Sequence, residues 1–384
     1  MGTKQPYQMS TRTITETVLR RSTSRSRTRL PNDPVESSSI AGLRYVRDNV
    51  PGIMRRRNGR GFCYENSAGR KIRDTKILER ISSLAIPPAW TKVWICPSPD
   101  GHLQAVGFDA KGRKQYRYHP RYRRIRNQTK FSRLSDFGQI LPVIRYRTKA
   151  HLALAGLPKE KVLASVVRLL ETTGIRVGNK ASATENHTFG LTTLRNNHVK
   201  TEGVTLRFRF VGKSGVKQAL EVSDPSVARI VRQCHELPGH HLFKYRDESG
   251  ELHSIDSGNL NAYLNEICGS EVTSKDFRTW VGTVHCAVAL QHIGGFRTPA
   301  QAKKNVALAI REAAEKLGNR PATCSAYYVH PAVLDAYLDG SLLSLMERAR
   351  TLPAKAKLFP EEAAVLKIIE SHAKTRAALL RTAA

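Results

Sequence analysis

The first third of the chain has short runs of β-forming residues that alternate with turn signals. Between residues 41 and 130 the runs are interrupted by Gly59-Arg60-Gly61, Pro97-Ser98-Pro99-Asp100-Gly101 and Lys111-Gly112. Such spacing is typical of short antiparallel strands joined by tight turns. The pattern therefore predicts a small, mostly β domain over 41–130.

After residue 130 the apolar positions follow a helical period. Between 161 and 171 the residues Val162, Val166 and Leu169 recur on one helix face, and Gly174 follows the expected end. The segment 299–317 also reads as a helix, with the apolar stripe Ala302, Val306, Ile310, Ala313 and Leu317. Thr298 can cap its start, Pro299 suits the first position and Gly318 ends it.

One strand pattern interrupts the helical region. Apolar and polar residues alternate over 204–210 and again over 216–222, and Gly212-Lys213-Ser214-Gly215 lies between them. This pattern predicts a β-hairpin with Lys213 at its flexible tip. The fold class is therefore α+β, with the small β domain followed by a larger, mostly α-helical domain over 131–340 that contains the hairpin. Residues 341–384 read as a helical tail.

The net charge points to the class of partner. The chain has 63 Lys plus Arg and 32 Asp plus Glu, which gives a formal charge of +31. A field of this size attracts polyanions, and binding to phosphates releases counterions. Nucleic acid is the leading partner, and anionic membrane surfaces, ribosomal packing and solubility are the alternatives. No apolar run approaches the length that crosses a bilayer, which excludes a membrane-spanning protein.

Residues 1–40 are rich in Ser, Thr and Arg and include the run Arg20-Arg21-Ser22-Thr23. Such a segment buries too little apolar surface to offset its ordering entropy, so we expect a disordered basic arm. The arm is either a solvated tail or a segment that tracks DNA. No apolar segment follows the Arg20-Arg21 pair, as an export signal would require.

The cysteines give no sign of a metal site. They are scattered, with no CxxC pair and no paired Cys/His spacing, at Cys63, Cys96, Cys234, Cys268, Cys286 and Cys324. We interpret them as reduced intracellular thiols and predict no metal. A cytoplasmic, nucleoid-associated location is the expectation.

A densely cationic and aromatic segment closes the predicted β domain. Basic side chains at this density can follow a phosphate backbone, and the tyrosines among them can donate to phosphate oxygens or pack on sugars. The alternative is a solvated basic face. The candidate DNA-binding residues are Tyr116, Arg117, Tyr118, Arg121, Arg123 and Arg124.

Cleaving a phosphodiester without a metal requires a nucleophile, cations around the pentacoordinate phosphorus and an acid for the leaving oxygen. Arg176 follows the glycine that ends a helix, where a guanidinium can clamp phosphate oxygens. Lys275 and Arg278 are three residues apart, and Thr273 with Asp276 has the spacing of a capping box, so both cations lie in the first turn of a helix. Lys213, Asn319 and Tyr328 complete the set.

The ordered motifs resemble the type IB DNA topoisomerases of the compact viral and bacterial kind over about 45 to 340. The resemblance rests on Ile86-Pro87-Pro88-Ala89-Trp90, Gln115-Tyr116-Arg117-Tyr118-His119, Gly174-Ile175-Arg176-Val177-Gly178, Glu185-Asn186-His187-Thr188-Phe189-Gly190-Leu191, Phe210-Val211-Gly212-Lys213, Ser274-Lys275-Asp276-Phe277-Arg278-Thr279 and the segment from Asn319 to Tyr328. It implies that the helical domain is catalytic and that the β domain binds DNA.

The resemblance also implies a role for each residue. Tyr328 attacks the phosphate to form a 3′-phosphotyrosyl link and release a 5′-hydroxyl, while Arg176 and Arg278 stabilise the transition state. Lys213 is the general acid, in relay with Lys275 and Arg176. Asn319 occupies a position that is His in many members, and an amide can donate a hydrogen bond there but cannot carry a proton. Tyr327 stays open as an alternative nucleophile.

The resemblance implies relaxation of supercoiled double-stranded DNA by a monomer that closes as a clamp, with no cofactor, metal, ATP or small-molecule substrate. Tyrosine recombinases use the same chemistry, but we expect a helical core-binding domain in them where this chain has the β-rich segment with Ile86-Pro87-Pro88-Ala89-Trp90. An architectural DNA binder or a catalytically inactive relative would need the basic field without the ordered Arg, Lys, Arg, Asn and Tyr set.

Overall fold

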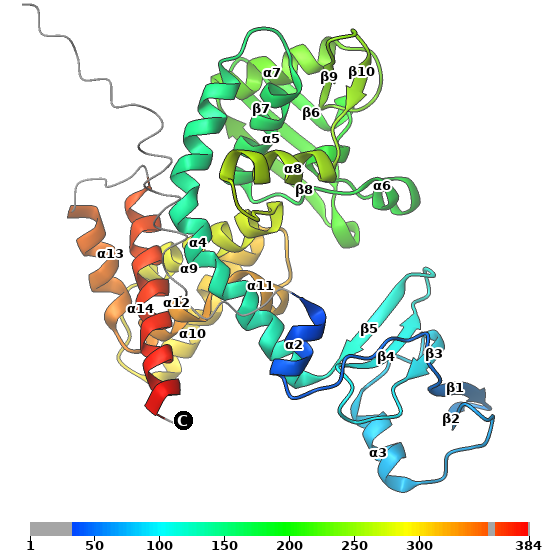
Figure 1. The fold of residues 1–384 in the computed structure, drawn as a ribbon. Helices are drawn as coiled ribbons and strands as arrows, with labels where there is room; N and C mark the ends of the chain where they lie inside the picture. The colour runs from blue at the N-terminus through cyan, green and yellow to red at the C-terminus, as the bar shows by residue number, and fades with distance from the viewer. Residues whose placement is uncertain (1–32, 352–357, 383–384) are drawn as a thin grey trace, which may run out of the picture. The chain divides into compact units, whose positions relative to one another are not determined.

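The computed structural model describes residues 33–351 and 358–382 and divides into two compact units. The described residues up to Ser132 form the N-terminal unit, and those from Arg133 onward form the C-terminal unit (Figure 1). The division falls inside helix α4 (Pro120–Leu152), close to the boundary that the sequence predicts at 130. No helix among the described residues has the length and apolarity to cross a membrane.

The N-terminal unit is built on a five-stranded antiparallel sheet with the strand order β2-β1-β3-β4-β5. Its strands are β1 (Ile53–Asn58), β2 (Gly61–Glu65), β3 (Thr91–Ile95), β4 (Leu103–Phe108) and β5 (Lys114–Tyr118), and its short helices are α2 (Pro34–Ile40) and α3 (Thr75–Ser83). Ile53, Val93, Ile95 and Ala105 from the sheet pack with Ile81 of α3 to form a small core. The predicted β domain is thus confirmed.

A buried arginine fixes the proline-rich segment of this unit. Arg55 of β1 donates to the carbonyl oxygens of Pro87 (3.0 Å) and Trp90 (2.6 Å), and its guanidinium lies 4.1 Å from the centre of the Phe62 ring. Burial lowers the pKa of Arg55 from its ordinary value. The carbonyl contacts hold the segment 86–90 against the sheet without any regular secondary structure.

Helix α2 corrects the predicted extent of the disordered arm. The Asp33 side chain accepts hydrogen bonds from the backbone N–H groups of Val35 (2.6 Å) and Glu36 (3.0 Å), and Pro34 takes the first helical position. An Asp cap followed by Pro is a strong helix start, and it outweighs the polar composition. The prediction was therefore wrong for 34–40, and residues 1–32 lie outside the described part of the chain.

Helix α4 also revises the end of the β domain. Because the helix begins at Pro120, Arg121, Arg123 and Arg124 lie on its first turns, whereas Tyr116, Arg117 and Tyr118 lie on β5. The basic and aromatic residues predicted to bind DNA therefore belong to two structural elements, a strand and the helix that follows it.

The C-terminal unit is mostly helical. Its helices are the remainder of α4, α5 (Lys159–Thr173), α6 (Lys180–Asn186), α7 (Pro225–Glu236), α8 (Ser257–Cys268), α9 (Ser274–Ile293), α10 (Pro299–Lys316), α11 (Pro321–Tyr328), α12 (Pro331–Leu338), α13 (Ser341–Thr351) and α14 (Pro360–Thr382). Its strands are β6 (Val199–Glu202), β7 (Thr205–Val211), β8 (Lys217–Ser223), β9 (Lys244–Arg246) and β10 (Leu252–Ser254). Both sheets are antiparallel, with the orders β6-β7-β8 and β10-β9.

The sequence-based helices and hairpin are confirmed. Helix α5 ends at Gly174, which adopts the left-handed conformation (φ 63°), and the Thr298 hydroxyl caps α10 through the backbone N–H of Gln301. The predicted hairpin is β7 and β8, and β6 extends it to three strands. Helix α5 is largely buried and packs against α7, α8, α9 and β8, so the helix that ends at Gly174 is held from several sides.

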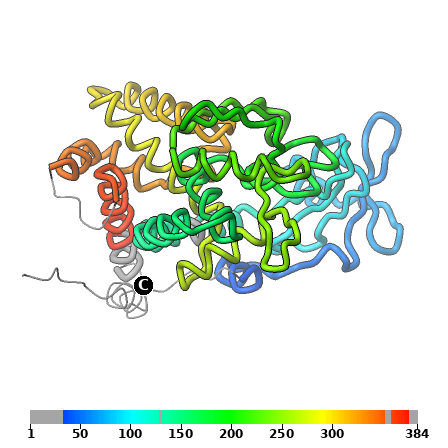
Figure 2. Tube along the Cα trace, turned by 90° about the horizontal axis from the view of Figure 1, so that it is seen from above, coloured from blue at the N-terminus to red at the C-terminus, as the bar shows by residue number. Residues whose placement is uncertain are grey.

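The predicted C-terminal tail is part of the same hydrophobic core. Helices α13 and α14 lie side by side in both views (Figures 1 and 2), and Val365, Ile368 and Ile369 of α14 are buried. At the start of α14, Glu362 pairs with Arg145 of α4 (2.8 Å) and accepts a hydrogen bond from Trp280 Nε1 of α9 (3.1 Å). The last helices therefore pack against α9.

Candidate active site

Arg176 lies on the extended segment that follows α5 and connects to the loop after α10. Its Nη1 donates to the carbonyl oxygen of Gly318 (3.2 Å), and its Nη2 donates to Asn319 Oδ1. Gly174 permits this arrangement, because an added Cβ would lie 2.7 Å from Leu317 and the residue has a positive φ. Residues far apart in sequence thus meet at one guanidinium.

Arg278 lies in the second turn of α9 and is 4% exposed. The helix begins as predicted, because Asp276 accepts hydrogen bonds from the N–H and hydroxyl of Thr273, both 2.8 Å. Arg278 Nη1 donates to the Gly174 carbonyl and Nη2 donates to the Leu317 carbonyl (3.0 Å). The guanidinium is therefore clamped between the two loops that hold Arg176 and Asn319.

Two buried donors at this site have no hydrogen-bond acceptor among the described residues. They are Arg278 Nε and Asn319 Nδ2. The orientation of the Asn319 amide is fixed because a guanidinium can only donate, so Oδ1 faces Arg176 and Nδ2 faces away from it. A buried donor without an acceptor costs free energy, and a phosphate oxygen would satisfy it. The pair therefore points to an oxyanion ligand.

Tyr328 is the last residue of α11 and lies against α9. The guanidinium carbon of Arg278 is 5.0 Å from the centre of the Tyr328 ring, and the Tyr328 carbonyl accepts a hydrogen bond from the Thr283 hydroxyl (3.2 Å). The two helices approach closely at Gly282, where an added Cβ would lie 2.7 Å from the Tyr328 carbonyl oxygen. Both the ring and the backbone of Tyr328 are thus placed by α9.

Tyr327 has a different environment from Tyr328. It is 39% exposed, whereas Tyr328 is half-buried and packs on the main core. Of the two tyrosines, Tyr328 is the one whose ring lies beside the Arg278 guanidinium. This geometry favours Tyr328 over Tyr327 as the nucleophile.

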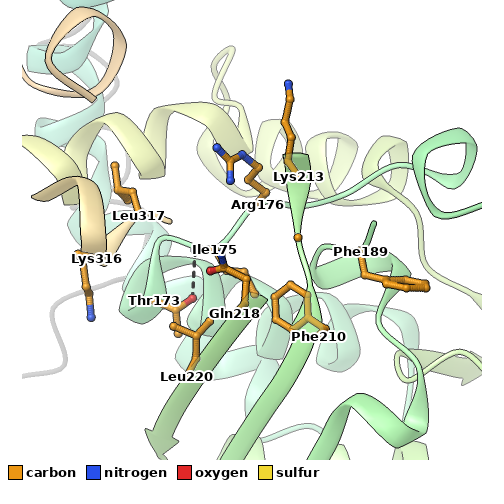
Figure 3. A pocket seen from close by; sticks show the side chains of 11 residues that line it. Thr173, Ile175, Arg176, Phe189, Phe210, Lys213, Gln218, Leu220, Lys316 and Leu317 are labelled. Carbon is orange, nitrogen blue, oxygen red and sulfur yellow. Dashed lines mark hydrogen bonds between the residues drawn. The ribbon is translucent and has the colours of Figure 1, made fainter. Parts of the chain in front are cut away.

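The tip of the β7–β8 hairpin comprises residues 212–216, and Lys213 is exposed there. It lines a pocket together with Arg176 from the segment after α5 and with Lys316 and Leu317 from the end of α10. Figure 3 shows Lys213 and Arg176 on the same side of this pocket, above Gln218, Phe210 and Leu220. The structure therefore brings Lys213 to the same place as Arg176.

Lys275 is the least constrained of the catalytic candidates. It is exposed in the first turn of α9, three residues before Arg278. Its backbone carbonyl accepts a hydrogen bond from the hydroxyl of Thr279, one turn later in the same helix (3.2 Å). Lys275 thus lies in the first turn of α9 as predicted, whereas Arg278, also predicted in the first turn, lies in the second.

Burial shapes the charges of the two arginines. The pKa of Arg278 is lowered to about 10, because burial and then the nearby charge of Arg176 lower it more than Tyr328 raises it. Burial also lowers the pKa of Arg176. Since Arg278 keeps its charge at neutral pH, the two partly desolvated cations repel each other, and an anion bound beside them would relieve that repulsion.

The candidate DNA-binding residues of the N-terminal unit form a row of rings and cations. Tyr116 and Tyr118, 45% and 38% exposed, stack with their ring centres 5.9 Å apart on one face of β5. Arg117 points to the other face and donates to the Ala85 carbonyl (2.7 Å). Arg121 pairs with Asp100 (3.4 Å), and Arg123 and Arg124 are exposed on α4.

One group of side chains in the described chain could hold a metal ion. Asp247, Glu251 and His253, at the β9–β10 turn, bring potential ligand atoms within 4.8 Å of one another. Asp247 already contacts His253 Nε2 (2.6 Å), and its other oxygen accepts the N–H groups of Ser249 and Glu251. The turn therefore accounts for the cluster, which includes none of the catalytic candidates.

Comparisons with known proteins decide the family. Residues 119–347 match the model of the eukaryotic DNA topoisomerase I catalytic core, and residues 61–109 match the N-terminal domain of bacterial DNA topoisomerase IB. The chain is 33% identical over 298 residues to DNA topoisomerase 1B of Acanthamoeba polyphaga mimivirus, covering 75% of this chain and 88% of the relative. The chain belongs to the type IB DNA topoisomerase family.

More distant relatives agree. DNA topoisomerase 1B of vaccinia virus (strain Copenhagen) is 24% identical over 245 residues, covering 63% of this chain and 75% of the relative. DNA topoisomerase I of monkeypox virus has the same identity and the same coverage. The recognition drawn from the sequence motifs is confirmed, and all of the catalytic candidates lie within the region matched by the catalytic core.

Two residues that the sequence motifs did not point to place Tyr328, the predicted nucleophile. Gly282 and Thr283 on α9 set the backbone of Tyr328, and Thr283 Oγ1 also accepts the N–H of His330 (3.1 Å). A glycine inside a helix destabilises it relative to alanine, so Gly282 in an otherwise regular helical pattern was a detectable sign of close packing. Nothing in the sequence indicated what it packs against.

Proposed function

We propose that this DNA topoisomerase, an isomerase that acts on DNA, relaxes supercoils by transient cleavage of one strand through a 3′-phosphotyrosyl intermediate, without metal or ATP. The observation that carries the proposal is the pair of buried donors, Arg278 Nε and Asn319 Nδ2, that lack an acceptor among the described residues, together with the Tyr328 ring beside the Arg278 guanidinium. A phosphate placed there would meet both donors and the nucleophile.

In the proposed reaction the phenolic oxygen of Tyr328 attacks phosphorus as its proton departs, and the bond from phosphorus to the 5′ oxygen breaks. Arg278 and Arg176 stabilise the charge that develops on the phosphorus oxygens, and Asn319 donates a hydrogen bond to one of them. Lys213 gives a proton to the leaving 5′ oxygen. A phosphate ester to Tyr328 replaces the phosphate ester to the 5′ oxygen, so the reverse reaction reseals the strand without an energy source.

Asn319 fits a stabilising role in this scheme. Its Oδ1 is occupied by Arg176, which leaves only its amide donor for the substrate. An amide cannot exchange protons at neutral pH, so proton transfer to the 5′ oxygen falls to Lys213, with Lys275 and Arg176 as relay partners. The exposed hairpin tip gives Lys213 the reach that such a transfer needs.

We also propose that the protein works as a monomer that closes on double-stranded DNA as a clamp, in the cytoplasm at the nucleoid. The division of the chain into two units joined within α4 supports the clamp, and the charge of +31 supports binding to the DNA backbone. DNA binding should weaken steeply as the salt concentration rises. Light scattering of the protein with a short duplex would test the monomer, since a mass of two chains per duplex contradicts it.

Plasmid relaxation tests the proposed reaction. The purified protein should relax both positively and negatively supercoiled plasmid in EDTA with no nucleotide, and Tyr328→Phe should relax neither. The matched control is Tyr327→Phe, which keeps the neighbouring ring and should retain activity. Relaxation that requires added Mg²⁺ or ATP, or full activity of Tyr328→Phe, would refute the proposal.

A further inference from the structure

Gln218 occupies a position where the pattern of β8 calls for an apolar side chain. Along β8 the residues 218, 220 and 222 share the inward face, and Leu220 and Val222 pack on the main core from that face. Gln218 is partly buried, while its neighbours Lys217 and Ala219 are exposed. A polar residue on an inward face lowers stability, so its presence there suggests a functional role.

The Gln218 side chain lies between two glycines. A Cβ added to Gly318 would lie 2.6 Å from Gln218 Nε2 and 2.8 Å from Oε1, and a Cβ added to Gly212 would lie 3.1 Å from Gln218 Cγ. The side chain therefore rests on the backbone of Gly212 and places its amide on the backbone of Gly318. Neither glycine can be replaced without displacing Gln218, and Gly318 also has a positive φ of 58°.

Both glycines adjoin catalytic candidates. Gly212 precedes Lys213, and Gly318 precedes Asn319 and accepts a hydrogen bond from Arg176 (3.2 Å). Figure 3 shows Gln218 in the floor of the pocket, with Arg176 and Lys213 above it. Gln218 thus contacts the hairpin that carries the proposed acid and the loop that carries the phosphate-binding groups.

The tip is closed by its own backbone hydrogen bonds, from the Gly212 N–H to the Val216 carbonyl (2.8 Å) and from the Gly215 N–H to the Gly212 carbonyl (3.1 Å). Residues 213–217 are exposed, and Ser214 has a positive φ of 64°. Gln218 is the first residue of β8 after the tip whose side chain turns inward, where it opposes Phe210 in the register of β7 and β8. Gln218 therefore links the base of the tip that carries Lys213, at Gly212, to the loop at Gly318.

We propose that Gln218 is a positioning residue that sets the distance between Lys213 and the phosphate held by Arg176 and Asn319. It need not touch the DNA itself. The inference rests on the proposed function, because it assigns Gln218 a task only if Lys213 is the general acid. A misplacement of about 1 Å can cost about a hundredfold in rate, so a small shift of the tip has a measurable effect.

The test uses single-turnover cleavage of two duplexes by the full chain. One duplex has the ordinary 5′ oxygen at the scissile phosphate, and the other has a 5′-bridging sulfur, which leaves without a proton. Gln218→Ala should slow cleavage of the oxygen duplex by about ten- to a hundredfold, because the acid is misplaced. The sulfur duplex should be cleaved within a few fold of the wild-type rate.

Two controls separate positioning from loss of structure. Val222→Ala removes an inward side chain from the same face of β8, farther from the tip, and should lower the melting temperature without changing the ratio of the two rates. Lys213→Ala should show the same rescue by sulfur as Gln218→Ala. If Gln218→Ala slows both duplexes equally, or slows neither, the positioning role is wrong. If the wild type makes no covalent adduct with either duplex, the proposed function fails as well.

Discussion

The catalytic candidates differ in how firmly the protein holds them. Both Arg278 and Arg176 donate hydrogen bonds to backbone carbonyls, and Arg176 also donates to Asn319. Arg278 is only 4% exposed. Lys213 and Lys275 are exposed, one at a hairpin tip and the other in the first turn of α9. The groups that would stabilise charge are therefore fixed before DNA arrives, whereas the groups that would move protons sit on the surface.

This contrast has a physical basis. Electrostatic stabilisation is most effective when the donors are fixed and shielded from water, since they then need no reorganisation during the reaction. A proton donor must keep its charge in the free protein, and a buried lysine would tend to lose it. A firmly held group and an exposed group should therefore respond differently to mutation.

The largest effect is expected for Lys213→Ala. General acid catalysis contributes about 10² to 10⁴ in rate, so cleavage of an ordinary strand should slow by a factor in that range. Thermal stability should stay unchanged because the side chain is exposed. Rapid-quench cleavage and a melting curve measure the two effects. A 5′-bridging sulfur should restore most of the rate, and its failure to do so would remove Lys213 as the acid.

Arg278→Ala should reduce both activity and stability. Losing one fixed donor to a developing negative charge costs about a hundred- to a thousandfold in rate. The carbonyls of Gly174 and Leu317 would also lose their donor, so the melting temperature should fall. Arg278→Lys keeps the charge but has no planar fork to reach both carbonyls, and it should not restore the rate. Wild-type stability in Arg278→Ala would contradict the firm clamp.

Asn319→Ala should have an intermediate effect. The loss of one hydrogen bond to a charged oxygen corresponds to about ten- to a hundredfold in cleavage rate. Asn319→Asp replaces the donor Nδ2 with an acceptor that repels phosphate, and it should be slower than the alanine variant. Comparing the two variants under single-turnover conditions separates donation from packing. An aspartate variant as active as the alanine variant would mean that Nδ2 does not face the phosphate.

The smallest effect is expected for a contact between α9 and α14 that includes none of the catalytic candidates. Trp280→Phe removes the hydrogen bond from Nε1 to Glu362 Oε1 (3.1 Å) and should lower stability by about 1 kcal/mol. The contacts of Arg278 with the Gly174 and Leu317 carbonyls remain in this variant, so the cleavage rate should fall by only a few fold. Urea unfolding and single-turnover cleavage measure the two changes. A loss of cleavage as large as that of Arg278→Ala would mean that α14 governs the site.

Local signals in the sequence predicted the elements well. Thr298, Pro299 and Gly318 define the ends of α10, and Thr273 with Asp276 defines the start of α9, because caps depend on neighbours within one turn. The alternation in β7 likewise placed Lys213 at a tip. The resemblance then supplied the chemistry of Tyr328 and its partners, which local patterns cannot provide.

Long-range packing was beyond the reach of those signals. Arg278 donates to Gly174 and Leu317, which are remote in sequence, and nothing in either segment announces the partner. The C-terminal helices were recognised as helices, but their burial against α9 depends on surfaces elsewhere in the chain. Composition also misjudged residues 34–40, where one Asp cap and one Pro suffice to start α2.

The most direct test of the central claim is the identity of the DNA-bound residue. The protein would be mixed with a duplex whose cleaved strand is labelled at its 5′ end, so that the label stays on the segment joined to the protein, and would then be denatured, digested with trypsin and analysed by mass spectrometry. We predict one modified peptide with the 3′ phosphate on the Tyr328 oxygen, present for Tyr327→Phe and absent for Tyr328→Phe. An adduct on Tyr327, or no adduct with the wild type, would contradict the account.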